Sequence, residues 1–595
     1  MGNPFELVTA SKLTAQQAID LWCDDKRLER VGGKENCFIN GHRGTGKSML
    51  FRILQYDCQK LLNPATEPDF LSVYFSVRNS ELLTEEVLFF QEDSQKYILS
   101  ESHFSLLLTK QLLLQIQSYP ELLEASKRTS LVALLKKQLA IALQFTSSPA
   151  VELGDDFPGA LVSALDLVER ERARLVQYIG LRLFDRAQFD GAVFLFDTLL
   201  GPLADFLLTN AAKTLYVLVD DADDLPESHK VILNTWIARR HTAVVFKIST
   251  MFGYKIYRTK GRSAIQHPHD FVQYDIATRY LMDDSEDYIQ LLREITRKRL
   301  VAESVGVSPE DFFPEDQVQA KAIKELEETL IEEYTKKYEG RSVRDHVYRH
   351  LSSEYIKRML SPGRSTDNFT YSGFKTLATL SSGMVRDFII VAQRMYDNAS
   401  RKTKNVLSIP PKIQSDAVKL HAETVLEEIT NHNQKRLDST KEDWKRIKLL
   451  ISGLGNIFKQ KMLSEDSERK VFSFAFQDEP SSEIERLLDL AISEGYLMKG
   501  FISKKEGTGR RPLYVLTRRL APLFNLDVTS YSGYLSATSE RIATLFELGT
   551  RVTVQDAQPQ LSLFADMEYF VGTPEAEVPE GKALWSLVAP EELGY

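Results

Sequence analysis

Apolar and polar positions alternate along the first 276 residues in a pattern of short apolar runs separated by longer amphipathic segments. In the segments 49–62 and 228–240, apolar residues recur at helical spacing. The apolar runs themselves have the length of buried strands, and they lie near 35–40, 70–76, 214–220, 242–249 and 271–276. Buried strands that alternate with helices predict an α/β fold with a parallel sheet.

Two longer helical regions depart from this alternation of strands and helices, one inside it and one after it. Between the second and third runs lie about 135 residues, far more than one crossover helix needs. The stretches SLVALLKKQLAIALQF and ALVSALDLVERERARLVQYIGLRLF in this interval have helical periodicity, which predicts a helical insertion at about 80–213 within a first domain, 1–276. From residue 277 to 408 the pattern stays helical, and KAIKELEETLIEEYTKKYEG predicts a charged, solvated helix inserted in that region.

The C-terminal third has a different pattern. Residues 409–525 contain two helical segments, the strand VFSFAF, a helix that starts at paired serines, and a hairpin around GTG, which together predict a winged-helix domain. Residues 526–595 are assigned to an acidic tail. From residue 552 onward this tail holds eight acids and one base, with aromatic residues between them, so it is either a solvating segment or a peptide that docks on a partner.

Composition narrows the class of protein. The chain has 43% hydrophobic and 26% charged residues, as is usual for soluble globular proteins. It has no apolar run of about 18 residues and no secretion signal at its start, so we expect a cytoplasmic protein. The net charge of -9 argues against general coating of nucleic acid. Three cysteines without CxxC spacing predict free thiols.

The strongest motif is the stretch ENCFINGHRGTGKS at 35–48. It matches GxxxxGK[ST] between a predicted strand and a predicted helix, the context in which this motif holds nucleotide phosphates. Glycines let backbone N–H groups face phosphate oxygens, Lys47 would reach the β- and γ-phosphates, and the Ser48 hydroxyl would ligate Mg²⁺. A chance glycine turn is the alternative. The predicted ATP-binding residues are Gly41, His42, Arg43, Gly44, Thr45, Gly46, Lys47 and Ser48.

A second site element is LYVLVDDADDL at 215–225. An apolar strand that ends in acids is the partner that such a phosphate-binding loop requires, so Asp220 is the predicted magnesium ligand and Asp221 the candidate base for water. Acids that merely end a strand in solvent are the alternative. The next strand ends in Ser249-Thr250, and Ser249 there could contact the γ-phosphate or the attacking water.

At residues 381–390, SSGMVRDFII, the chain resembles the AAA+ ATPases of the initiator clade, the origin-recognition-complex-like proteins of bacterial type. Their second acidic motif is roughly Asp-Glu-x-Asp-x-Leu, and Asp221 stands here at the Glu position. Their lid carries a Gly-x-x-Arg turn, which Gly383 and Arg386 match, and the resemblance implies that Arg386 contacts the γ-phosphate. The resemblance covers about residues 1–525 and implies a helical lid and a C-terminal winged helix.

The resemblance also implies partners. Such proteins complete their site with an arginine from a neighbouring subunit, which makes a homo-oligomer or a partner effector protein an expectation. The candidates for that arginine are Arg239, Arg240, Arg258 and Arg262, with ordinary surface arginines as the alternative. The predicted recognition helix, 481–497, is acidic, so nucleic acid would be bound by the basic wing, through Lys504, Lys505, Arg510 and Arg511. A protein-binding winged helix is the other possibility.

Three functions are compatible with these residues. The first is an ATP-hydrolysing switch with slow turnover, because Asp221 is one methylene shorter than Glu and a misplacement of about 1 Å can cost on the order of 10²-fold in rate. The second is a scaffold that binds ATP without hydrolysing it. The third is a DNA-binding initiator or loader. Similar proteins also occur in anti-phage loci, which by analogy implies a sensor or regulator in bacterial anti-phage defence.

Overall fold

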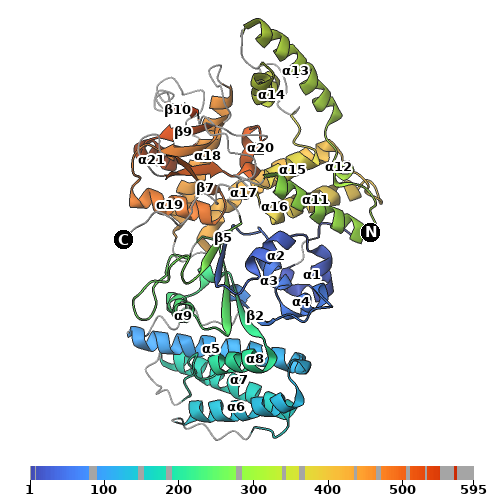
Figure 1. Ribbon diagram of the computed structural model, residues 1–595. Coiled ribbons are helices and arrows are strands. Elements are labelled where there is room, and N and C mark those ends of the chain that lie inside the picture. Colours follow the sequence, from blue (N-terminus) through green and yellow to red (C-terminus); the bar gives the residue numbers. More distant parts are fainter. Residues whose placement is uncertain are drawn as a thin grey trace, which may run out of the picture.

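The computed structural model describes most of the chain (Figure 1). The described residues are 2–6, 9–79, 90, 92–144, 146, 153–182, 191–252, 254–276, 285–337, 343–360, 369–434, 439–463, 471–503, 510–528, 533–549 and 568–571. Within them, no helix is long and apolar enough to cross a membrane.

The first domain is built on a five-stranded parallel sheet in the order β2-β3-β4-β1-β5. Strands β3 and β4 are buried along their whole length, as expected of strands covered on both faces. All five predicted strands are present within two residues of their expected bounds, so the predicted α/β class is confirmed. The strands are β1 (Cys37–Asn40), β2 (Phe70–Ser76), β3 (Thr214–Asp220), β4 (Val244–Thr250) and β5 (Val272–Asp275).

Alternate residues of β3 enter two different cores. Leu215, Val217 and Val219 pack with the helices of the insertion, whereas Tyr216 and Leu218 pack with the helices around the phosphate-binding loop. The sheet is therefore covered on both faces. The helices on the second face are α1 (Ala15–Leu21), α2 (Asp25–Val31), α3 (Lys47–Ile53) and α4 (Tyr56–Leu62).

The predicted insertion is a helical subdomain at the end of the molecule opposite to the C-terminal domain (Figure 1). Its first helix has no counterpart in the predicted helices, because Ser100, Glu101, Ser102, His103 and Ser105 are buried polar residues that break the apolar periodicity. Helix α9 (Glu227–Ala238) of the core packs against this first helix. The insertion consists of α5 (Asp93–Ser118), α6 (Ala125–Leu143), α7 (Phe157–Arg182) and α8 (Leu200–Ala211).

The lid region shares one hydrophobic core with the C-terminal domain. Helices α13 and α14 form a hairpin that projects from it, with a small core of its own, and α13 is the predicted charged helix (Figure 1). The helices of this region are α11 (Ser285–Ala302), α12 (Pro309–Phe312), α13 (Gln317–Lys337), α14 (Val343–Leu360), α15 (Phe374–Leu380) and α16 (Val385–Ser400).

The C-terminal domain contains the predicted succession of helices, strand, helix and hairpin. Its sheet has the order β10-β9-β6-β8-β7. The helices are α17 (Pro411–Glu428), α18 (Lys441–Leu463), α19 (Ser482–Ser493), α20 (Ala521–Phe524) and α21 (Ser539–Leu548). The strands are β6 (Val471–Phe476), β7 (Leu497–Ser503), β8 (Arg510–Leu516), β9 (Gly533–Ala537) and β10 (Glu568–Val571).

The boundary of the predicted acidic tail needs correction. Strand β9 pairs in parallel with β6, and α21 packs against α18, so residues 533–548 belong to the folded domain rather than to a tail. The pairing partner of β9 lies about 60 residues upstream, and such a long-range pairing leaves no local pattern in the sequence. The later part of the predicted tail falls outside the described residues, except for β10, which pairs with β9.

Candidate nucleotide site

The phosphate-binding loop joins the end of β1 to the start of α3. Gly44 and Gly46 have φ angles of +92° and +95°, a left-handed conformation that favours glycine and explains Gly46 of the motif and Gly44 within the loop. Within the loop the Thr45 hydroxyl donates to the carbonyl oxygen of His42 at 2.9 Å. Arg27 of α2 also stabilises the loop, because its Nη1 donates to the carbonyl oxygen of Thr45 at 3.1 Å.

Lys47 is buried at the first position of α3. Its Nζ donates to the carbonyl oxygens of Gly41 at 2.5 Å and of His42 at 3.1 Å. Burial lowers the pKa of this ammonium group, and the nearby Asp220 carboxylate opposes that shift. Ser48, the predicted magnesium ligand of the loop, is exposed, and so is Arg43.

Asp220 ends β3 and is held by both neighbouring strands. Tyr74 of β2 donates its hydroxyl to Oδ2 at 3.0 Å, and the Ser249 hydroxyl of β4 donates to Oδ1. The Asp220 side chain is 2% exposed, so these donors replace the water that its carboxylate would otherwise bind. Ser249 thus contacts the predicted magnesium ligand, and its own predicted contact with the γ-phosphate or the attacking water stays a prediction.

Asp221 has left-handed backbone geometry, with φ of +58°, a conformation in which Asp is tolerated better than most residues. Its N–H donates to Ser249 Oγ at 3.0 Å, which fixes the turn. Burial raises the pKa of its carboxyl, and the neighbouring Asp220 adds to this shift. Arg78, which follows β2, places its Nε 3.8 Å from Asp221 Oδ2.

The last two acids of the motif have structural partners that the sequence does not reveal. Asp223 Oδ2 accepts from the backbone N–H of Met251 at 2.5 Å, so it ties the end of β3 to the end of β4. Asp224 forms the closer ion pair with Arg78. Arg78 therefore stands between Asp221 and Asp224, and only the pairing of β2 with β3 brings it there.

The lid meets the phosphate-binding loop directly at Arg386. Its backbone N–H donates to the carbonyl oxygen of Gly44 at 3.0 Å. A Cβ atom at Gly44 would lie 2.7 Å from Arg386 Cβ, so only glycine permits this approach. Gly383, with φ of +78°, forms the turn before α16. The predicted Gly-x-x-Arg turn is thus adjacent to the predicted ATP-binding loop.

His42 connects the loop to the C-terminal domain. Its ring lies 5.1 Å from that of Phe252, in the segment after β4, and its Nδ1 is 3.5 Å from the position of a Cβ atom at Gly495, beyond α19. Burial, with Lys47 and Arg519 adding to it, lowers the pKa of His42 to about 3, so the side chain is neutral.

The arginines predicted to act on a neighbouring subunit lie at the surface of the core. Three of them form ion pairs within the chain: Arg239 with Asp197, Arg240 with Asp270, and Arg258 with Glu227. Arg262 is exposed in a left-handed turn. Their predicted role stays a prediction.

The predicted nucleic-acid surface is reduced by internal contacts. Arg511 donates to the carbonyl oxygen of Phe476 and to the Tyr534 hydroxyl, at 3.3 and 2.8 Å, so it serves the fold of the domain. Arg510 is exposed, and Lys504 and Lys505 lie outside the described residues. On α19, residues 490–493 are buried, and Asp489 pairs with Lys255 of the core at 2.6 Å.

The donor set agrees with Mg²⁺. This ion takes oxygen ligands, usually one or two carboxylates together with phosphates and water, and Asp220 with the Ser48 hydroxyl is such a set. The described residues contain no group of three or more His, Cys, Asp or Glu side chains that could hold a metal, so at this site phosphate oxygens and water would have to supply the remaining ligands.

Comparison with protein families gives one match: a family model described as ORC-CDC6-like covers residues 3–536. Comparison with curated proteins gives no significant match. Similar solved structures include Cdc6p from Pyrobaculum aerophilum, at 11% identity and a TM-score of 0.25, over 91% of this chain and 97% of that one. Another is the Drosophila ORC bound to DNA, at 11% identity and a TM-score of 0.25, over 87% of this chain and 94% of that one.

Proposed function

Because the chain belongs to the ORC-CDC6-like family, we propose that it is an AAA+ switch that binds ATP with Mg²⁺ and hydrolyses it slowly. One observation carries this proposal: the loop with Lys47, the acidic end of β3 and the lid turn with Arg386 come together at the carboxyl ends of the parallel strands β1 and β3. These are the parts that an ATP site of this class requires, and they come from three distant segments of the chain.

In this site the phosphates of ATP would lie along the loop, with the Lys47 ammonium group close to the β- and γ-phosphates. Mg²⁺ would neutralise charge on the phosphate oxygens, held by Ser48 and Asp220. Water attacks the γ-phosphorus, the bond to the β–γ bridging oxygen breaks, and Asp221 accepts the proton of the water. Arg386 would stabilise the charge that develops on the γ-phosphate.

Two features of Asp221 support slow turnover. Its side chain is one methylene shorter than the Glu of the resembling family, and Arg78 lies 3.8 Å from its carboxylate. An ion pair with Arg78 competes with the orientation that a catalytic base needs, and small errors in orientation are costly in rate. A slow hydrolysis step suits a protein whose ATP-bound form must persist.

The test uses three variants. Lys47→Ala should abolish binding of a fluorescent ATP analogue, and Asp221→Asn should bind it normally but stop phosphate release. Lys213→Ala is the matched control, since Lys213 is also a buried lysine of this domain but lies at the opposite end of β3. Binding that survives Lys47→Ala would overturn the ATP site. Parental turnover in Asp221→Asn would overturn the assignment of the base.

The non-hydrolysing scaffold is the second candidate, and the Arg78–Asp221 contact is the observation that favours it. The same variants separate the two. A switch releases phosphate at a rate that Asp221→Asn abolishes, whereas a scaffold binds ATP and releases none above the Lys47→Ala background.

A DNA-binding initiator or loader finds less support in the described residues. The apolar side of α19 packs into the hydrophobic core shared by the lid and the C-terminal domain, its exposed side carries Glu483 and Glu485, and Arg511 is engaged inside the domain. Salt-dependent binding of duplex or single-stranded DNA that is lost in Arg510→Ala would support this function. The absence of binding at low salt would exclude it.

Self-assembly, a partner effector and a role in anti-phage defence extend the proposal, with the family resemblance as their support. Assembly is tested by sedimentation with ATP and with ADP, where an ATP-dependent oligomer is expected. The defence role is tested by phage challenge of cells that carry the chain with its neighbouring genes. Lys47→Ala should then lose protection to the same extent as deletion of the gene.

A further inference from the structure

The phosphate-binding loop, the lid turn and the C-terminal domain meet at a single residue, Gly495. A Cβ atom at this position would lie 3.5 Å from His42 Nδ1, from Met384 Sδ and from Arg519 Nη2. Its φ of +75° is left-handed, and it lies one residue beyond Glu494, the C-cap of α19. Three elements of different domains are thus packed around one turn.

Arg519 makes the polar contacts of this junction. Its Nη1 donates to Asp387 Oδ2 at 2.8 Å, and its Nη2 donates to the carbonyl oxygens of Glu494 at 3.2 Å and Gly495 at 3.0 Å. Its guanidinium also lies 5.5 Å from the centre of the Tyr496 ring. The side chains of Arg519 and Asp387 are only 11% and 12% exposed, so the ion pair is poorly screened by water.

Asp387 is the residue after Arg386, in the first turn of α16. Its partner Arg519 therefore acts on the same turn whose backbone N–H is bonded to Gly44. A second bond supports the contact, because the N–H of Arg518 donates to Ser382 Oγ at 2.8 Å, at the other side of the turn. The C-terminal domain thus forms hydrogen bonds with the lid turn at both of its ends.

We propose that Arg519, contributed by the C-terminal domain, is a positioning residue of the ATP site: its pairing with Asp387 holds the turn of Arg386 against the phosphate-binding loop. This inference rests on the proposed function. Arg519 touches no part of the predicted nucleotide position, and it acts through Asp387 and through Gly495, which packs on His42.

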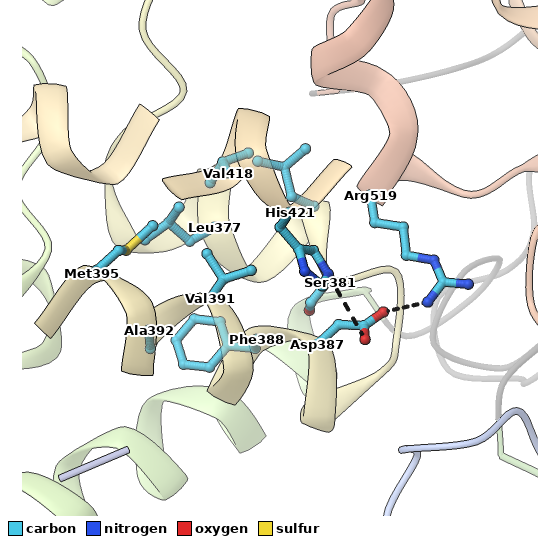
Figure 2. A pocket seen from close by; sticks show the side chains of 11 residues that line it. Leu377, Ser381, Asp387, Phe388, Val391, Ala392, Met395, Val418, His421 and Arg519 are labelled. Atoms are coloured by element: carbon cyan, nitrogen blue, oxygen red, sulfur yellow. Dashed lines mark hydrogen bonds and ion pairs between the residues drawn. The ribbon is translucent and has the colours of Figure 1, made fainter. Parts of the chain in front are cut away.

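A small, mostly apolar cavity adjoins Asp387. Figure 2 shows a cavity lined by Leu377, Phe388, Val391, Met395 and Val418, with Asp387, His421 and Arg519 at one side. His421 Nε2 is 3.9 Å from Asp387 Oδ1, too long for a hydrogen bond. Burial lowers the pKa of His421 to about 4, so it is neutral at pH 7. Arg519 is then the cation that fixes Asp387 here.

The experiment compares affinity for fluorescent ATP and ADP analogues, because Arg386 is expected to contact only the γ-phosphate. In Arg519→Met the preference for ATP over ADP should fall about tenfold, or about 1.4 kcal/mol. It should fall to the value found in Arg386→Ala. Arg519→Lys keeps a positive charge that can pair with Asp387 but lacks the planar guanidinium with its several N–H donors. It should therefore retain part of the preference that Arg519→Met loses.

Arg486→Met is the matched control. Arg486 pairs with Asp443 at 2.5 Å inside the C-terminal domain, so this variant loses an Arg–Asp pair without touching the lid, and its ATP preference should equal the parental one. A double-mutant cycle of Arg519→Met with Asp387→Asn should be non-additive. If Arg519→Met does not fold, Asp387→Asn alone measures the same loss of preference.

These measurements distinguish a failure of the proposed function from a failure of this inference alone. If the parental chain fails to bind ATP, or binds it equally well with Lys47→Ala, the proposed function is wrong. If the parental chain binds ATP and Lys47→Ala does not, but Arg519→Met and Asp387→Asn keep the parental ATP preference, this inference alone is overturned.

Discussion

Acidification should loosen the contact between the insertion and the core, because two buried histidines face each other there. His103 of α5 and His229 of α9 are 1% and 0% exposed. Burial lowers the pKa of His103 to about 4, and the nearby Arg172 adds to this shift. Burial lowers the pKa of His229 to about 3, with His103 adding to it. Both side chains are neutral in the folded protein at pH 7.

The magnitude follows from linkage. The pKa of a histidine in an unfolded chain is about 6.5. When the folded state lowers this pKa, the free energy of unfolding is unaffected by the histidine above pH 6.5. It falls as the pH drops from 6.5 to the folded pKa, because the unfolded state then binds the proton more readily. Each unit of pH in this window costs about 1.4 kcal/mol per histidine, so the two together cost about 4 kcal/mol between pH 7.5 and pH 5. This is a large fraction of the 5–15 kcal/mol typical of folded domains.

Hydrogen exchange of the amides of α5 and α9 measures this locally, which matters because a chain of several domains does not unfold in one step. With correction for the intrinsic exchange rates, the free energy of opening should fall by about 4 kcal/mol between pH 7.5 and pH 5. His103→Leu removes one titrating group and should lose only about 2 kcal/mol. At pH 7.5 this variant should be at least as stable as the parent, because neither ring nitrogen of His103 has a hydrogen-bond partner among the described residues.

His269→Gln is the control, since His269 is exposed on a turn away from α5, and its pH dependence should match the parental one. A parental slope in His103→Leu would refute the reasoning, and so would equal opening free energies of the parent at pH 7.5 and pH 5.

Three further substitutions test other contacts. Gly44→Ala puts a Cβ atom 2.7 Å from Arg386 Cβ at a left-handed position, so we expect weaker ATP binding together with a lower melting temperature. Gly455→Ala puts a Cβ atom 2.3 Å from the Phe524 ring, and it should lower the free energy of unfolding by about 1–3 kcal/mol in a thermal melt. Glu101→Ala leaves the buried N–H donors of Phe196 and Trp236 without their acceptor and removes the ion pair with Lys260. It should raise exchange in α5 by an amount equivalent to about 3–5 kcal/mol.

The central sheet was predictable from the sequence chiefly because β1, β3 and β4 are buried along their whole length. Such strands are apolar at nearly every position, so LYVLVDD stands out against its surroundings, and Asp220 marks the point where the strand leaves the core. The phosphate-binding loop was predictable for a similar reason, because its glycines are required by left-handed backbone angles at Gly44 and Gly46.

Helix α5 was not predictable by periodicity, since its buried face at 100–105 is mostly polar and bonds to other segments. The contacts of Arg78 and Arg519 were not predictable either. Each is an ordinary charged residue in its local sequence, and each meets its acidic partner only after distant strands and domains have packed. Local patterns reveal elements, whereas these contacts depend on how the elements are assembled.

The turn after α19 lies between the proposed ATP site and the C-terminal domain. The exposed side of α19 carries Glu483 and Glu485, its apolar side packs into the core shared by the lid and the C-terminal domain, and Gly495 in the turn lies beside His42. A ligand of the C-terminal domain that displaces Gly495 from His42 would separate this domain from the phosphate-binding loop, and that movement would disturb the contacts of Arg519 with Gly495. Coupling of this kind is reciprocal, so any factor by which such a ligand weakens ATP binding is the factor by which ATP weakens binding of the ligand. The rate of the proposed hydrolysis would then set how long the contact between Gly495 and His42 persists.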